Sequence, residues 1–307
     1  MLDSVSLDQL RTFLAAAEAG SFSAAGRRLG RAQSVVSQTL GALERQLGVQ
    51  LFDRSARYPM LTEAGTALVP EARAVAGRMD AFKARARDLA GGLEPELSVA
   101  IDVMVPIQVF THAVRDFQAI FPNTPLRVHV EALGAVIQPV LDRRCAVAVV
   151  GTLPLVPPEL AQERLRSLRM VMVASPDHPL AGHAAPIPKA DLVEHVQLVL
   201  TDRSALSRGR EFGVFSPRAW YIADLGAKHA FLLAGLGWGG MPYPMVEADL
   251  AAGRLVELEI EDGWPEGNLL PLLAVHRKDT PPGPAGRWLI ERLRDTFAQC
   301  PTHLASA

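Results

Sequence analysis

The chain has 307 residues, of which 49% are hydrophobic, and its formal net charge is −2. This length allows two or three domains with separate cores, and the near-neutral charge argues against a general polyanion-binding protein. The longest apolar runs, residues 97–101 and 146–150, are too short to cross a bilayer. Residues 1–4 do not begin a signal peptide, and the two cysteines lie far apart. We therefore expect a cytoplasmic protein with no membrane partner.

The first part of the chain predicts three short helices. Residues 7–17 carry apolar side chains at helical spacing. Ser23 is expected to cap a second helix over residues 24–29, which a glycine ends. A third helix over residues 33–47 has an apolar stripe on one face and polar side chains beside it. Two helices joined by a tight turn, the second with a polar start, are typical of a helix-turn-helix.

The third helix and the segment after it carry residues suited to DNA. Amide and hydroxyl groups at the start of an exposed helix can read base edges. Residues 51–61 are expected to form a short hairpin, or wing, whose arginines can follow the phosphates or enter the minor groove. Residues 27–57 have a local net charge of +4, although an ordinary solvated face would look the same. The candidate DNA contacts are Ser23, Arg31, Gln33, Ser34, Ser37, Gln38, Arg54 and Arg57.

A long helix is expected over residues 62–90. Its apolar side chains recur at steps of three and four residues, and two glycines follow it. One apolar stripe on an otherwise charged helix favours pairing with a second copy of the chain. Packing against its own chain is the alternative. The candidate dimerisation residues are Leu68, Val75, Met79, Phe82 and Leu89.

From residue 96 the pattern changes to alternating strands and helices, which predicts an α/β fold with a parallel sheet and crossover helices. A first series of strands covers residues 97–101, 126–131 and 146–150. A second series begins with a strand at residues 170–174. A break near residues 263–267 indicates that the chain then returns to the first sheet.

Several motifs occur in a fixed order along the first 65 residues. They are Leu-Arg-Thr-Phe at 10–13, Gly-Ser-Phe-Ser-Ala-Ala at 20–25, Gln-Ser-Val-Val-Ser-Gln at 33–38, the stretch 43–54 and Leu-Thr-Glu-Ala-Gly at 61–65. In these motifs the chain resembles the LysR-type transcriptional regulators. The second half resembles that family more loosely, at residues 121–122, 176–180 and 234–242.

The resemblance implies a winged helix-turn-helix DNA-binding domain at residues 1–61 and a linker and dimerisation helix at residues 62–92. An effector-binding domain at residues 93–307 would follow. It would have two Rossmann-like subdomains, as in periplasmic binding proteins: one formed by 93–163 with 269–300, the other by 164–268. The implied partners are promoter DNA, RNA polymerase, a small-molecule effector in the cleft between the subdomains, and further copies of the chain, as a dimer or tetramer.

Carried over residue by residue, the family's base-contacting positions fall on Gln33, Ser34, Ser37 and Gln38, and the wing arginine falls on Arg54. One departure is Ala32, which stands where the family often has a serine or threonine cap. Loss of such a cap weakens the start of a helix by about 0.5–2 kcal/mol.

The resemblance also places the effector cleft. Ligands of open α/β sheets lie beyond the carboxyl ends of the strands, and helix N-termini favour anions. The loop after the first strand of the effector domain, residues 104–106, is apolar. This indicates a ligand with an apolar or aromatic part rather than a simple dicarboxylate. Asp202 and Asp224 would suit a donor or cationic group, unless Asp224 only caps the following helix. The implied cleft residues are Met104, Val105, Pro106, Gly134, Thr152, Thr201, Asp202, Asp224 and Leu225.

No pattern in the sequence indicates catalysis, a metal site or a cofactor. The eight histidines are scattered without metal-ligand spacing. A buried cysteine such as Cys145 is expected to be a small hydrophobe rather than a redox sensor. Two other functions would share parts of this organisation: an enzyme with a DNA-binding head, and a solute-binding protein. The first lacks visible catalytic residues, and the second does not account for the N-terminal helices.

Overall fold

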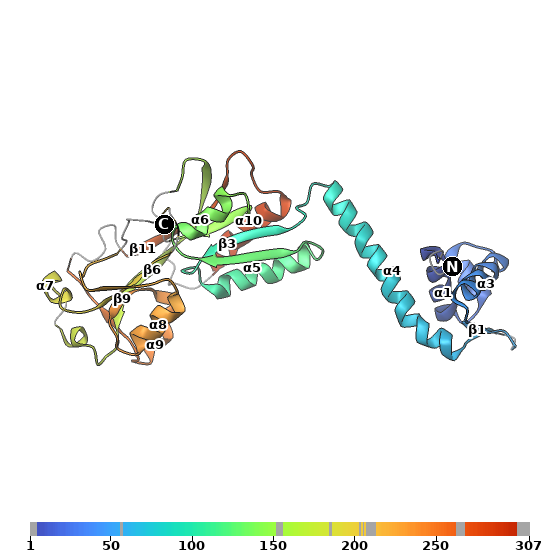
Figure 1. Cartoon of the computed structure of the whole chain (residues 1–307), viewed down its shortest axis with the longest axis horizontal. Coiled ribbons are helices and arrows are strands. Elements are labelled where there is room, and N and C mark those ends of the chain that lie inside the picture. The colour runs from blue at the N-terminus through green and yellow to red at the C-terminus, as the bar shows by residue number, and fades with distance from the viewer. Residues whose placement is uncertain are drawn as a thin grey trace. The chain divides into compact units, whose positions relative to one another are not determined.

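The computed structural model describes residues 5–55, 58–151, 156–183, 186–202, 204, 206, 213–261 and 268–299. The chain divides into two compact units between Gly91 and Gly92, here called the N-terminal and C-terminal units. Figure 1 labels their elements along the chain. Among the described helices, none has the length and apolarity needed to span a membrane.

The N-terminal unit is a helix-turn-helix with a short hairpin and a long final helix. Its core contains Phe13, Phe22, Leu40 and Phe52, with the ring of Phe22 meeting that of Phe52 edge to face at 5.2 Å. The elements are α1 (Leu7–Ala19), α2 (Phe22–Leu29), α3 (Gln33–Leu47), β1 (Phe52–Asp53), β2 (Met60–Leu61) and α4 (Glu63–Ala90).

The start of α2 differs from the sequence prediction. Ser21, and not Ser23, is the N-cap: its hydroxyl accepts a hydrogen bond from the backbone N–H of Ala24 at 3.2 Å. The earlier start places Phe22 on the buried face of the helix, and burial of this aromatic ring decides between two possible serine caps. Ser23 is left exposed on the first turn.

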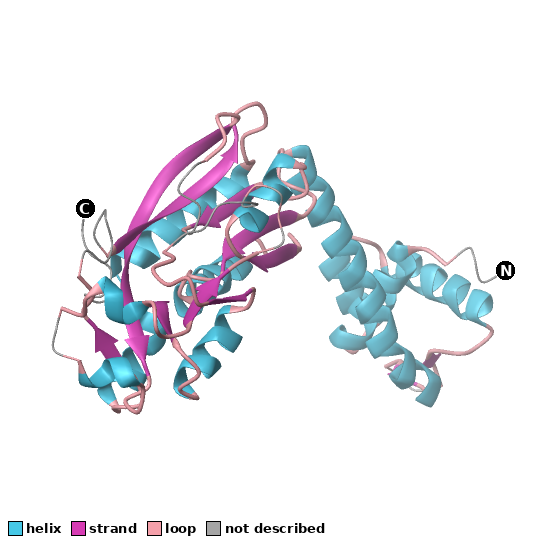
Figure 2. Ribbon diagram, turned by 60° about the vertical axis from the view of Figure 1, so that its left-hand side comes forward, coloured by secondary structure: helices cyan, strands magenta, loops and turns pink. Residues whose placement is uncertain are grey.

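The C-terminal unit is built on one mixed sheet of nine strands, with helices on its faces (Figure 2). The strands lie in the order β4-β3-β5-β11-β6-β9-β7-β8, and β10 pairs with β6. Their bounds are β3 (Leu97–Asp102), β4 (Leu126–Glu131), β5 (Val147–Val150), β6 (Leu160–Ala174), β7 (Gln197–Leu200), β8 (Ala219–Ile222), β9 (Trp238–Pro242), β10 (Val256–Leu258) and β11 (Leu269–Arg277).

The helices of this unit connect and cover the strands. The largest hydrophobic cluster joins α5, α10 and the strands between them and contains Leu97, Phe117, Leu168 and Phe297. The helices are α5 (Ile107–Ile120), α6 (Gly134–Leu141), the 3₁₀ turn η2 (Pro179–Gly182), α7 (Lys189–Leu192), α8 (Leu225–Leu233), α9 (Tyr243–Ala251) and α10 (Pro284–Gln299).

Two long antiparallel strands, β6 and β11, join the halves of the sheet. The first part of β6 pairs with β11, and its last five residues pair with β9. Strands β3, β4 and β5 are parallel, as are β7, β8 and β9. The sheet is therefore mixed: the strands of each half are parallel, as predicted, but β6 and β11 run antiparallel between them. The strand predicted at 170–174 is the end of the longer β6. Residues 160–169 are mostly polar, with Leu165 and Leu168 isolated among polar neighbours, which hides the long strand from a search for apolar runs.

Candidate DNA-binding interface and effector cavity

Helix α3 presents a polar face to solvent. Val36, Leu40 and Leu43 are fully buried and fix the rotation of the helix against the core. Gln33, at the first turn of α3, and Ser34 and Gln38, away from this stripe, are exposed, while Ser37 is half-buried. Three of the four predicted base-reading residues are thus free to meet a groove, and the fourth lies at the edge of the same surface.

The start of α3 is set by a tight turn rather than by a capping side chain. Ala32 is the N-cap and makes no side-chain hydrogen bond there. A Cβ atom on Gly26 would lie 2.6 Å from the carbonyl oxygen of Arg31, so only glycine fits at this point of α2. The close approach of α2 to the Arg31–Ala32 turn positions the first residues of α3.

Two of the arginines counted in residues 27–57 form ion pairs with acidic residues from outside that window. Arg28 pairs with Glu18 at 2.7 Å, and Arg31 makes two 2.7 Å hydrogen bonds to the carboxylate of Asp8. The hydrogen bonds from Arg31 lower the pKa of Asp8. Because Asp8 and Glu18 lie outside residues 27–57, the positive charge counted in that window overstates the charge of the surface.

Arg54 is held in place at the base of the hairpin. Its guanidinium donates to Glu44 at 2.7 Å and lies 5.5 Å from the centroid of the Phe22 ring. The other oxygen of Glu44 accepts from the backbone N–H groups of Leu51 and Phe52. Glu44 therefore connects α3 to the hairpin and fixes the position of the Arg54 side chain. Arg57, the second predicted wing arginine, lies outside the described residues.

The remaining predicted DNA contact, Ser23, accepts a 3.0 Å hydrogen bond from Arg27 on the next turn of α2. Both side chains are exposed. The pair presents a hydroxyl and a guanidinium on one face of α2, a combination that can hold a phosphate.

The predicted stripe on α4 divides into two parts. Leu68 packs on the core of the N-terminal unit, where α1 and α4 meet. Val75, Met79, Phe82 and Leu89 are exposed, and Phe82 exposes 68% of its surface. The first part of the stripe thus serves the fold of its own chain, and the second part is left uncovered within it.

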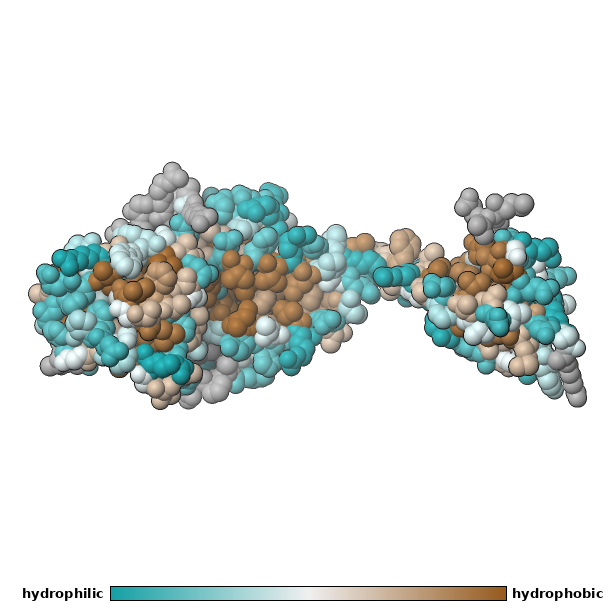
Figure 3. Space-filling view, turned by 60° about the horizontal axis from the view of Figure 1, so that its bottom comes forward, coloured by the Kyte–Doolittle hydropathy of each residue, from teal (hydrophilic) through white to brown (hydrophobic). Residues whose placement is uncertain are grey.

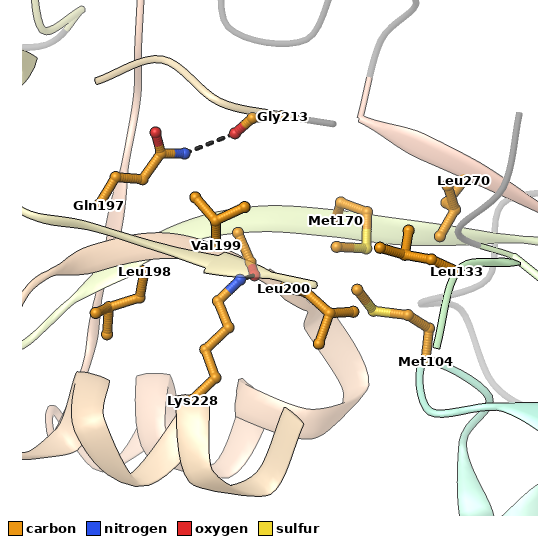
Figure 4. A pocket seen from close by; sticks show the side chains of 11 residues that line it. Met104, Leu133, Met170, Gln197, Leu198, Val199, Leu200, Gly213, Lys228 and Leu270 are labelled. Carbon is orange, nitrogen blue, oxygen red and sulfur yellow. Dashed lines mark hydrogen bonds between the residues drawn. The ribbon is translucent and has the colours of Figure 1, made fainter. Parts of the chain in front are cut away.

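A cavity of about 90 Å³ lies at the carboxyl end of β7 in the C-terminal unit (Figure 4). It lies between residues of both halves of the sheet, and apolar side chains dominate its wall. Its lining residues are Met104, Leu133, Met170, Gln197, Leu198, Val199, Leu200, Gly213, Lys228, Gly240 and Leu270. Of the predicted cleft residues that the structure describes, Met104 is the one in this lining.

Several other predicted cleft residues lie near this cavity without lining it. The carboxylate of Asp202 accepts a 2.8 Å hydrogen bond from the backbone N–H of Ala135, in the first turn of α6 beside Gly134. This bond crosses between the two halves of the sheet. Thr201 is half-buried, and its hydroxyl points to the carbonyl oxygen of Asp202 at 3.4 Å.

The other predicted cleft residues that the structure describes cap a helix, lie in the core or precede a helix. Asp224 caps α8, accepting from the N–H of Ala227 at 2.6 Å, so the capping alternative describes its contact in this structure. Val105 and Leu225 are buried in the core, and Pro106 precedes α5. Thr152 lies outside the described residues.

Lys228 is the charged residue of the cavity, and the sequence prediction did not include it. Its ammonium group donates a 2.7 Å hydrogen bond to the carbonyl oxygen of Gly240, and burial lowers its pKa to about 7. The signal was available, since Lys228 is the one lysine in a helix of otherwise mostly apolar residues.

Reactive or metal-binding groups do not add to this site. Cys145 is buried and burial raises the pKa of its thiol, which opposes formation of the reactive thiolate. No cluster of three or more histidine, cysteine or acidic side chains suited to a metal occurs within the described part of the chain.

Comparison with known proteins agrees with this organisation. Residues 7–66 match the family model of bacterial regulatory helix-turn-helix proteins of the lysR family, and residues 90–298 match the LysR substrate binding domain. The probable HTH-type transcriptional regulator YhaJ of Escherichia coli K12 is 30% identical over 301 residues, which cover 95% of this chain and 97% of YhaJ.

Solved structures show the same fold. A Corynebacterium glutamicum OxyR mutant is 23% identical, with a TM-score of 0.58 over 96% of this chain and 93% of its own. CbnR, a LysR family transcriptional regulator, is 25% identical, with a TM-score of 0.52 over 94% of this chain and 100% of its own. CbnR has also been solved in full length with its target DNA. With both family models and a relative across nearly its whole length, this chain belongs to the LysR family of transcriptional regulators.

Proposed function

We propose that this chain binds promoter DNA through α3 and the β1–β2 hairpin and that a small molecule in the cavity of the C-terminal unit controls the outcome. The exposed polar face at the start of α3 carries this proposal, because amides and hydroxyls there can reach base edges. Gln33, Ser34, Ser37 and Gln38 would read the bases, and Arg31, Arg54 and Arg57 would contact phosphates. The solved complex of CbnR with its target DNA supports the same use of the fold.

The assembly that meets DNA would contain at least two copies of the chain. Val75, Met79, Phe82 and Leu89 expose apolar area along α4, and pairing with a second α4 would remove it from water. The C-terminal unit also shows brown apolar patches in Figure 3. Its edge strands β4 and β8 expose Val128, Val130, Trp220 and Tyr221. A second copy of the chain could cover such edge strands. The resulting oligomer, bound at a promoter, would then contact RNA polymerase.

Binding to the DNA upstream of its own gene tests this function. Fluorescence anisotropy of a labelled duplex should show binding that weakens linearly in log salt between about 50 and 200 mM. A duplex of the same composition and scrambled sequence should bind more weakly. Arg54→Ala should lower the salt slope by up to about 1, and Gln118→Ala, an exposed change in the C-terminal unit, should leave both quantities unchanged.

Equal binding of the two duplexes would contradict sequence reading, and no binding at low salt would contradict the proposed function as a whole. An unchanged salt slope for Arg54→Ala would remove the hairpin arginine from the interface.

A further inference from the structure

The cavity of the C-terminal unit contains one buried charge-bearing group in an apolar wall. Met104, Leu133, Met170 and Leu270 supply thioether and aliphatic surface. Gln197, the other long polar side chain in the wall, is already bonded. Its amide N–H donates to the carbonyl oxygen of Gly213 and its oxygen accepts from the N–H groups of Phe215 and Ser216. The chemistry available to a ligand therefore centres on Lys228.

Lys228 is only 4% exposed, and it uses one of its three N–H donors on Gly240. No carboxylate forms an ion pair with it among the residues that the structure describes, and β7 and β9, which flank it, carry no charged side chain. The charged groups nearest in sequence are engaged: Asp224 caps α8, and His229 bonds Asp249 at 2.8 Å. A buried ammonium without a counter-charge is costly unless a ligand supplies one.

The start of α6 is already occupied by an acidic side chain of the protein itself. Asp202 accepts from the N–H of Ala135 in the first turn of α6, so its carboxylate occupies a position that favours negative charge. Among the described residues that line the cavity, Lys228 is the one that can carry a charge, so a second carboxylate on a ligand would find no second cation there. Lys228 can therefore neutralise the charge of one anionic group of a ligand.

The size of the cavity limits the body of the ligand. Its volume of about 90 Å³ is smaller than the roughly 150 Å³ apolar cavity that accepts benzene in another protein. Short aliphatic chains of a few carbon atoms are compatible with this space and with the methionine and leucine side chains around it.

We propose that the effector is a small monocarboxylate with an aliphatic body, whose carboxylate pairs with Lys228 while its body fills the apolar cavity. This inference rests on the proposed effector control and specifies the chemical class of the effector. The lowered pKa of Lys228 is consistent with it, since a bound anion would restore the charged form at neutral pH.

Thermal unfolding of the full chain tests this assignment. All four tryptophans lie after residue 92, so their fluorescence reports on the C-terminal unit alone. The probes are acetate, butyrate and hexanoate, their amides as neutral isosteres, and succinate. At least one monocarboxylate should raise Tm in a saturable way at fixed ionic strength, because it binds only the folded state. Its amide and succinate should not.

Two variants assign the effect to Lys228. Lys228→Met should weaken binding of the stabilising acid by about 10-fold or more, as expected for loss of a charged hydrogen-bond partner. Lys278→Met, an exposed lysine of the same unit, should bind it as the wild type does. If Lys228 had only a structural role, Lys228→Met would shift Tm by the same amount with and without the acid, and the wild type would not distinguish acid from amide.

The other outcomes are equally clear. Each of four results would overturn the inference. These are equal stabilisation by acid and amide, preference for succinate, unchanged binding by Lys228→Met, and no saturable effect of any monocarboxylate. DNA binding by the same samples separates it from the proposed function. If an amide rather than an acid changes the DNA complex, effector control stands and the Lys228 assignment is wrong. If no sample binds DNA, the proposed function itself is wrong.

Discussion

Replacing Lys228 with methionine should raise the free energy of unfolding of the C-terminal unit at neutral pH. It should also remove the contribution of this lysine to the pH dependence of that free energy. Burial lowers the pKa of this lysine from 10.5 to about 7. At pH 7 this shift lowers the free energy of unfolding by roughly 4 kcal/mol, because the lysine is protonated in the unfolded chain and burial opposes that protonation in the folded chain. Methionine removes that cost but leaves the carbonyl of Gly240 without its donor, which costs about 1–3 kcal/mol. The expected net gain at pH 7 is therefore about 1–3 kcal/mol.

The sign of the pH dependence follows from proton binding. Between pH 7 and 10.5 the unfolded chain holds the lysine proton and the folded chain does not, so the stability of the wild type rises with pH across this window. The penalty is fully present below about pH 7. The advantage of Lys228→Met should consequently shrink by roughly 3 kcal/mol between pH 7 and pH 10.

Denaturant unfolding followed by tryptophan fluorescence at a series of pH values measures this difference. Lys278→Met is the matched control and should show no such change, since that lysine is exposed. A difference between wild type and Lys228→Met that stays constant from pH 7 to pH 10 would refute the reasoning, as would a strong destabilisation by methionine at pH 7.

Three further substitutions test the N-terminal unit. Ala32→Ser supplies the missing cap of α3 and should raise stability by about 0.5–2 kcal/mol, measured by hydrogen exchange of α3 amides; unchanged protection would contradict it. Gly65→Ala places a Cβ 2.1 Å from the carbonyl oxygen of Leu51 and should destabilise this unit by about 1–3 kcal/mol in circular-dichroism melts; a neutral effect would show that the backbone there yields. Phe82→Glu should reduce self-association in sedimentation equilibrium, and an unchanged mass would remove α4 from the interface.

Helical periodicity and glycine stops predicted most of the N-terminal unit. The helices at 33–47 and 63–90 emerge directly from spacing, because each carries an apolar stripe. The stripe of α3, with Val36, Leu40 and Leu43, is buried, whereas the second part of the α4 stripe is exposed. The cap of α2 was misplaced from Ser21 to Ser23, since neighbouring serines have the same capping chemistry and only the burial of Phe22 distinguishes them. Local pattern therefore identified the elements, and tertiary packing fixed their ends.

Long-range features escaped prediction. The pairing of β6 with β11 joins residues about a hundred positions apart, and the hydrogen bond from the N–H of Ala135 to the carboxylate of Asp202 spans 67 positions. The ion pairs of Arg28 and Arg31 likewise involve acids outside the basic window. Lys228 reaches the cavity only because α8 packs across β7 and β9, which sequence spacing alone does not specify.

The most direct test of the central claim measures how Gln33→Ala changes base discrimination. Wild type and variant would be titrated against every single-base substitution of the bound duplex at one salt concentration. If α3 reads bases, discrimination should fall by about 1–3 kcal/mol at one position and persist at the others, while Gln118→Ala matches the wild type. A uniform loss of affinity across all duplexes, or no change at any position, would contradict the placement of α3 in the major groove.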